Sequence, residues 1–107
     1  MVEHERDIQR AILDYLSLKR IVAFRINSGA MKVGSAGNER YMRLAPRGTP
    51  DILGYTKDGH FLAIEVKRKG GTVSTEQQEF IDGVNRAGGI GLVAYSLDDV
   101  IKEFNAM

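Results

Sequence analysis

The chain has 107 residues, and its 15 Lys and Arg outnumber its 14 Asp and Glu by one, which gives a net charge of +1. Hydrophobic residues make up 43% and charged residues 27%, so we expect one globular domain over residues 1–107. The absence of cysteine excludes a disulfide scaffold, a thiolate zinc site and a cysteine nucleophile. No apolar run approaches the ~20 residues of a spanning helix, and the charged start MVEHERDIQR is unlike a signal peptide. We therefore expect a cytoplasmic protein without membrane contact.

The charges are unevenly distributed along the chain. Residues 1–18 carry a net charge of −2, residues 19–71 carry +7 and residues 72–107 carry −4. A basic middle between acidic ends indicates a cationic face suited to a phosphate-bearing partner. The alternative is that these Lys and Arg residues only solvate loops, and charge alone does not decide between the two.

The first half of the chain shows a helical period and then a long glycine-bearing stretch. Apolar residues recur at helical spacing between Ile8 and Leu16, which predicts an amphipathic helix over residues 5–17. The β-branched and aromatic composition of residues 21–26 predicts a strand. Residues 27–47 contain three glycines among Ser, Lys and Arg, and we expect a long loop there with a candidate short strand at residues 40–44. Loops of this length are uncommon unless they have a function.

The second half alternates strands and helices. Pro50 is compatible with the first position of a strand, and Asp58-Gly59 is typical of a hairpin turn. Ser74 is a helix cap, and two glycines end that helix. In chain order we expect strand 51–56, turn 57–60, strand 61–67, helix 74–86, strand 90–95 and helix 97–104. This order indicates one mixed sheet flanked by helices.

Two carboxylates and a lysine are the candidate chemical site. Alternation along strand 61–67 places Glu65 and Lys67 on one face, where buried charges need a partner or a role. The hairpin brings Asp51 near Glu65 if a bulge absorbs a one-residue difference. Paired carboxylates are stabilised by a hard divalent cation, and a nearby lysine can orient water or offset phosphate charge. The pattern favours metal-assisted phosphodiester hydrolysis; the alternative is a structural salt bridge of Glu65 with Lys67 or Arg68.

Helical spacing adds two further candidates. At about 100° per residue, Glu5 lies within the apolar stripe of the first helix and could be a third site carboxylate. Equally, Glu5 could only interact with the helix dipole. Gln77 lies in the apolar stripe of its helix, whereas Gln78 does not, so Gln77 could reach the site or the nucleic acid. Gln77 is also the last residue of a capping box that begins at Ser74, and the two roles are compatible.

Three sequence segments together resemble a known nuclease superfamily. The segments are Gly-Thr-Pro-Asp at residues 48–51, Ala-Ile-Glu-Val-Lys-Arg at 63–68 and Val-Ser-Thr-Glu-Gln at 73–77. They resemble the motifs of the PD-(D/E)XK nucleases, and more narrowly of the VRR-NUC (virus-type replication-repair nuclease) branch. Residues 5–9 and 24–29 are also similar to that branch. The resemblance covers about residues 5–96 and implies an α/β, restriction-endonuclease-like fold with an αβββαβ core.

The resemblance also implies roles for the candidate residues. Asp51 and Glu65 would ligate Mg²⁺ or Mn²⁺, helped by the backbone carbonyl of Val66 and by Glu5, directly or through water. Lys67 would position or activate the attacking water. The implied protein is a metal-dependent DNA endonuclease of replication, repair or recombination, similar to junction resolvases. It would act as a homodimer on branched or junction DNA, with a viral or mobile-element origin.

Gln77 would support this site or the phosphate, and basic residues near the site are candidate phosphate contacts. The basic candidates are Arg25, Lys32, Arg40, Arg43, Arg47, Arg68 and Lys69. Tyr41 and Tyr55 could stack on bases, although a core or rim position is the simpler expectation. No P-loop pattern is present, so we expect no nucleotide cofactor. Two alternatives to the enzyme are a non-cleaving nucleic-acid-binding module on the same fold and a small scaffold dimer.

Overall fold

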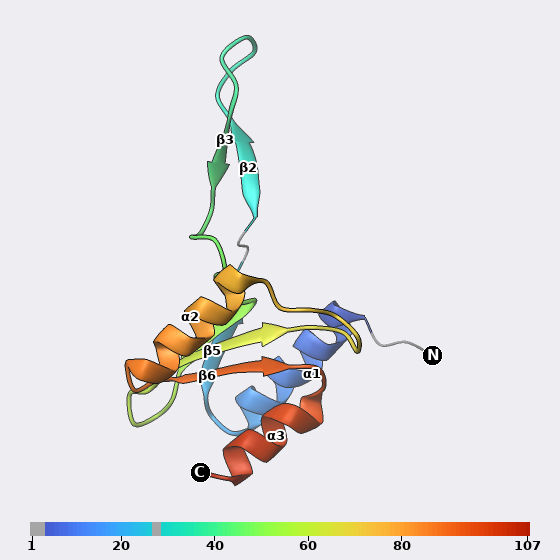
Figure 1. Cartoon of the computed structure of the whole chain (residues 1–107), viewed down its shortest axis with the longest axis vertical. Helices are drawn as coiled ribbons and strands as arrows, with labels where there is room; N and C mark the ends of the chain where they lie inside the picture. The colour runs from blue at the N-terminus through green and yellow to red at the C-terminus, as the bar shows by residue number, and fades with distance from the viewer. Residues whose placement is uncertain (1–3, 27–28) are drawn as a thin grey trace.

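A mixed four-stranded sheet organises the chain (Figure 1). The computed structural model describes residues 4–26 and 29–107. Its elements are α1 (Glu5–Leu18), β1 (Val22–Arg25), β2 (Ala30–Val33), β3 (Arg40–Arg43), β4 (Ile52–Tyr55), β5 (Phe61–Val66), α2 (Thr75–Arg86), β6 (Ile90–Ala94) and α3 (Leu97–Asn105). The sheet order is β1-β4-β5-β6, in which only the β5–β6 pair is parallel. Without β2 and β3, the order from α1 to β6 is αβββαβ, so the expected fold is confirmed.

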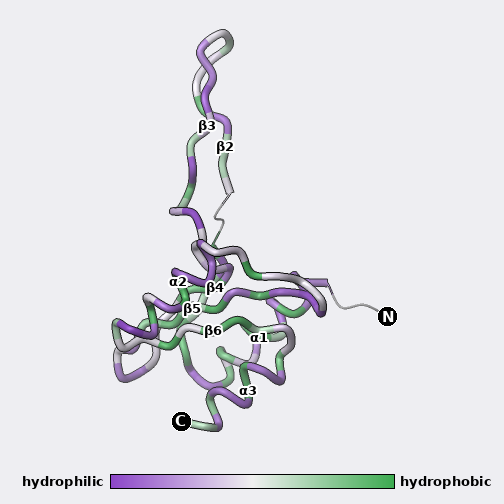
Figure 2. Tube along the Cα trace, in the orientation of Figure 1, coloured by the Kyte–Doolittle hydropathy of each residue, from purple (hydrophilic) through white to green (hydrophobic). Residues whose placement is uncertain are grey.

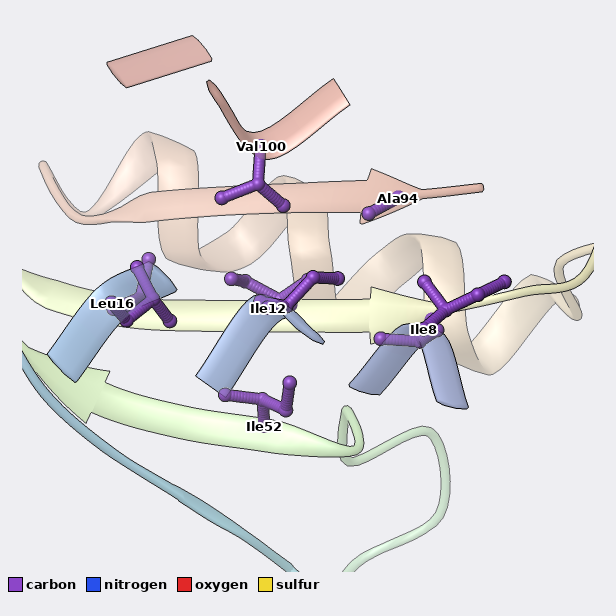
Figure 3. Close-up of a cluster of buried hydrophobic side chains, with 9 residues drawn as sticks. Ile8, Ile12, Leu16, Ile52, Ala94 and Val100 are labelled. Carbon is purple, nitrogen blue, oxygen red and sulfur yellow. The ribbon is translucent and has the colours of Figure 1, made fainter. Parts of the chain in front are cut away.

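Helices cover both faces of the sheet, and β5 is therefore buried on both faces from Leu62 to Val66. Ile12 of α1, Ile52 of β4 and Val100 of α3 belong to the larger core cluster, on one face (Figure 3). Ala63 of β5 packs with Ile81 of α2 on the other face, in a smaller cluster. Side chains alternate along a strand, so Glu65 shares the face of Ala63 and lies on the α2 side. Among the described residues, no helix is long and apolar enough to cross a membrane.

β2 and β3 form a separate antiparallel hairpin that projects from the body (Figure 1). We call this hairpin, residues 30–43, the arm; it lies along the 53 Å long dimension of the molecule. The expected short strand near residues 40–44 is present as β3, but β2 was not predicted. Polar and apolar residues both occur along the arm (Figure 2), and neither strand packs on the core, so no burial pattern identified β2. Residues 27 and 28 of the expected loop lie outside the described residues.

The β4–β5 hairpin has a regular ladder that runs from the pair Tyr55–Phe61 to the pair Ile52–Ile64. The bulge expected between these strands is therefore absent. Thr56 belongs to the turn and not to the strand, and its amide donates to the carbonyl of His60 at 2.9 Å. The turn is therefore one residue longer than the expected 57–60, and this accounts for the one-residue difference without a bulge. Only Gly59 in this turn has a positive φ, of 87°.

Candidate active site

Asp51 and Glu65 meet at one end of the β4–β5 hairpin. The ladder pairs Ile52 with Ile64, so the next residues outward, Asp51 and Glu65, continue the same register. Asp51 Oδ2 accepts a hydrogen bond from the amide of Val66 at 2.9 Å. The carbonyl of Asp51 accepts from the amide of Ile26 at 2.8 Å, which holds its backbone against the end of β1. Asp51 is thus held on both sides by the two strands that flank β4.

Glu65 is a buried carboxylate with one unsatisfied oxygen. The residue is 3% exposed, its Oε2 accepts from Gln77 Nε2 at 3.2 Å, and Lys67 Nζ lies 3.6 Å from the same oxygen. Its Oε1 is buried and has no hydrogen-bond partner among the described residues. Burial, and then the charge of Asp51, raise the pKa of Glu65 from its ordinary 4.5 to about 7, against the opposing effect of Lys67. A group that supplies positive charge beside Oε1 would satisfy this oxygen and favour the ionised form.

Gln77 reaches the site from the first turn of α2 while it also caps that helix. Its side-chain Oε1 accepts a hydrogen bond from the backbone amide of Ser74 at 2.9 Å. The backbone amide of Gln77 donates in return to Ser74 Oγ at 3.1 Å, which completes the capping box. Its remaining polar group, Nε2, donates to Glu65. The cap fixes the side chain of Gln77, and the two roles that the sequence left open occur together.

Two residues of the Gly-Thr-Pro-Asp segment to which the sequence analysis gave no role help to position Asp51. Gly48 has a φ of +81°, and a Cβ at this position would overlap the backbone carbonyl of Glu76 at the start of α2. Buried Thr49 donates from its hydroxyl to the carbonyl of Pro46 at 2.6 Å. The segment before Asp51 therefore packs closely against α2. The glycine three residues before the aspartate was the available signal, but its contact with α2 is visible only in the fold.

Glu5 lies beside the site rather than within the carboxylate pair. Its Oε2 accepts from the amide of Arg68 at 3.3 Å, which ties the start of α1 to the segment after β5. Within residues 4–26 and 29–107, no group of three or more His, Cys, Asp or Glu side chains is placed to hold one metal ion. The structure thus brings Asp51 and Glu65 together without Glu5. Its role as a ligand, like that of the Val66 carbonyl, stays a prediction.

The basic candidates are exposed and spread over several elements. Arg43 and Arg47 line one polar cleft of about 360 Å³ with Gln77 and the start of α2. A larger, more apolar hollow of about 640 Å³ surrounds Phe61 and the C-terminal half of α2, away from the carboxylates. Tyr41 was expected in the core or at its rim. The core position is wrong, because this residue is 76% exposed on the arm.

The donor set suits a hard divalent cation. Carboxylate oxygens are the ligands that Mg²⁺ and Mn²⁺ prefer, and here one of them, Glu65 Oε1, is buried and has no hydrogen-bond partner in the part of the chain that the structure describes. This arrangement follows the order of motifs in the sequence, and residues 4–98 match the VRR-NUC domain family. The chain belongs to the VRR-NUC family. No match is found among the curated proteins.

Family membership makes this chain a nuclease domain, expected to act on DNA. In this VRR-NUC domain, Asp51 immediately precedes β4, Glu65 lies in the adjacent strand β5, Lys67 follows β5, and Gln77 comes from α2. The catalytic candidates predicted from sequence therefore lie at one edge of the sheet, next to the cleft lined by Arg43 and Arg47.

Proposed function

We propose that this VRR-NUC domain is a Mg²⁺- or Mn²⁺-dependent endodeoxyribonuclease that hydrolyses phosphodiester bonds. One observation carries the proposal: the carboxylates of Asp51 and Glu65 meet at the end of a hairpin, beside the ammonium of Lys67. One oxygen of Glu65 is buried there without a partner among residues 4–26 and 29–107. An unpartnered buried carboxylate oxygen is costly to the fold. A site that binds a cation in its working state accounts for its presence.

The residues of this site have complementary tasks. Asp51 and Glu65 would hold the ion, with the Val66 carbonyl and, through water, Glu5 as further ligands. When bound, Mg²⁺ or Mn²⁺ supplies positive charge that acidifies a water and offsets charge on the scissile phosphate. Lys67, whose side chain is only 16% exposed, orients the attacking water or stabilises negative charge that develops on the phosphate.

Gln77 fixes the orientation of the Glu65 carboxylate through its bond to Oε2. Because Gln77 is itself held by the capping box, the bond is preorganised before substrate arrives. Gln77 also lines the cleft with Arg43 and Arg47, whose guanidinium groups can contact a phosphate next to the one that is cut. The cleft therefore connects the catalytic edge with a cationic surface.

The proposed substrate is branched or junction DNA, cut by a homodimer during replication, repair or recombination. Exposed large apolar residues, among them Phe24, Tyr55 and Phe61, supply surface that a second copy could cover. Two sites in one dimer would suit a substrate with two strands to cut. Sedimentation velocity tests the dimer, and the cleavage rates of a four-way junction and its matched linear duplex test the substrate preference.

The cleavage reaction itself tests the proposal. Supercoiled, linear and four-way-junction DNA are incubated with Mg²⁺, Mn²⁺ or EDTA and with the wild type, Lys67→Ala or Lys102→Ala. Lys102 is an exposed lysine on α3 that pairs with Asp98, and serves as the control. We expect metal-dependent cleavage that Lys67→Ala loses and Lys102→Ala retains. DNA binding without cleavage in any metal would instead indicate a non-cleaving module, and no DNA affinity even at low salt would indicate a scaffold.

A further inference from the structure

The two faces of the arm differ in chemistry. Side chains of directly paired residues in an antiparallel ladder point to the same face, and successive residues alternate. The pair Lys32–Tyr41 therefore shares a face with Arg43, which is opposite Ala30. We call this the basic face. The pair Met31–Met42 lies on the other face, together with Val33 and Arg40. One side of the arm thus carries two basic residues and a tyrosine. The other side carries one arginine, a valine and two methionines that can pack on each other across the strands.

The basic face leaves an aromatic ring open to solvent between two cations. Tyr41 is 76% exposed, although a ring of this size usually buries most of its surface in a core or an interface. Lys32 is paired with Glu39 at 2.6 Å, whereas Arg43 has no ion pair with any residue in the described part of the chain. A ring beside a free guanidinium is a surface for a polyanion that also offers flat apolar groups, which is the chemistry of a nucleic acid.

The basic face reaches a cleft that adjoins the active site. Arg43 lines the cleft of about 360 Å³ that Gln77 also lines, and Gln77 donates to the Glu65 carboxylate. At the base of the arm, the amide of Leu44 donates to the carbonyl of Gly29 at 2.9 Å, which keeps the two arm strands together as they enter the body. A DNA backbone that lies over the catalytic edge can therefore pass through this cleft, which Arg47 and Glu76 also line, to Arg43 and Tyr41 of the arm.

We propose that the basic face of the arm binds duplex DNA beside the bond to be cut. Arg43 contacts a phosphate, Tyr41 packs against the sugars and base edges, and the two-stranded ribbon lies along a groove. The major groove of DNA is wide enough for a two-stranded β-ribbon. This inference rests on the proposed function for its substrate, but it adds a binding element that extends beyond the body of the domain.

The arm supplies its own matched controls. Arg43 and Arg40 are exposed arginines of the same strand, and the sequence offered both as phosphate contacts. The register with β2 places Arg43 on the basic face and Arg40 on the opposite face, so Arg40 serves as the control for Arg43. Tyr41 and Met42 are adjacent exposed apolar residues, also on opposite faces. The four alanine variants are compared by fluorescence anisotropy with a labelled duplex in EDTA, over a series of NaCl concentrations. Circular dichroism checks the fold of each variant, and sedimentation velocity checks its oligomeric state.

We expect Arg43→Ala and Tyr41→Ala to weaken binding about fivefold or more, and Arg40→Ala and Met42→Ala to weaken it less than about twofold. Arg43→Ala should also lower the salt dependence, as the slope of log K against log salt, by about one, the contribution of one phosphate contact. Equal effects on both faces would overturn the proposal. So would a loss of binding that accompanies a change in oligomeric state, because the arm would then contact a second copy of this chain.

The outcome is separable from that of the proposed function. If the wild type cuts DNA but the basic-face variants bind as the wild type does, the arm proposal fails and the nuclease stands. If binding depends on the basic face but no metal supports cleavage, the arm proposal stands and the nuclease fails. A wild type that binds no duplex even at low salt overturns both.

Discussion

Glu65→Gln should stabilise the metal-free protein at alkaline pH. The carboxylate is 3% exposed, and burial followed by the charge of Asp51 raises the pKa of Glu65 from 4.5 to about 7. The folded state therefore binds this proton more tightly than the unfolded state does. The stabilisation from Glu65 is fully present below pH 4.5, decreases as the pH rises, and is lost above about 7. Glutamine keeps the shape and the hydrogen-bond acceptor for Gln77 but has no proton to lose.

The size of the effect follows from the shift in pKa. One pKa unit corresponds to about 1.4 kcal/mol. The raised pKa of Glu65 therefore lowers the free energy of unfolding of the protein by up to about 3 kcal/mol between pH 4.5, where Glu65 is protonated in the fold, and pH 8, where it is ionised. Glu65→Gln should remove most of this dependence. A bound divalent cation should also offset it, because it favours the ionised carboxylate.

Urea unfolding of the wild type and Glu65→Gln in EDTA, at pH 5 and pH 8, measures this difference. The wild type should lose more unfolding free energy than Glu65→Gln between these pH values. Added Mg²⁺ should stabilise the wild type at pH 8 and leave Glu65→Gln unchanged. Identical pH dependence in the two proteins would refute the reasoning, because Glu65 would then titrate alike in the folded and unfolded states.

Three other changes test separate parts of the site. Lys67→Ala should lower the cleavage rate by about a hundredfold or more while duplex binding in EDTA changes little; an unchanged rate would exclude the lysine from catalysis. Gln77→Ala should reduce cleavage and lower the melting temperature, since it removes the Glu65 contact and the hydrogen bond from the Ser74 amide, each worth about 1 kcal/mol. The exposed-residue variant Gln78→Ala should change neither the cleavage rate nor the melting temperature. Gly48→Ala should destabilise the protein more than Gly59→Ala, because both glycines have positive φ but only Gly48 faces a backbone carbonyl; equal melting temperatures would contradict this contact.

Local signals in the sequence accounted for the elements that carry the site. The capping box from Ser74 to Gln77 marks the start of α2, and helical spacing pointed Gln77, rather than Gln78, at the carboxylates, as the structure has it. Alternation in β5 placed Glu65 on the face opposite Leu62, Ile64 and Val66, which belong to the larger core cluster. The hairpin placed Asp51 beside Glu65, although the extra residue lies in the turn and not in a bulge.

Features that depend on packing between distant segments could not be predicted. The bond of Glu5 to the amide of Arg68 joins residues 63 positions apart and depends on how α1 packs against the sheet. The contact between Gly48 and α2 has the same character. The β2 strand has no buried face, so its side chains show no core pattern, and the two faces of the arm become apparent only when the register with β3 is known.

The dependence of DNA cleavage on Mn²⁺ concentration tests the central claim most directly. The rate of nicking of supercoiled plasmid is measured across a Mn²⁺ titration for the wild type, Asp51→Asn and Asp58→Asn, where Asp58 is an exposed carboxylate in the β4–β5 turn. We predict that Asp51→Asn abolishes nicking or raises the half-maximal Mn²⁺ concentration at least about tenfold, while Asp58→Asn matches the wild type. Half-maximal concentrations that are the same in all three proteins would contradict a metal-dependent site built on Asp51 and Glu65.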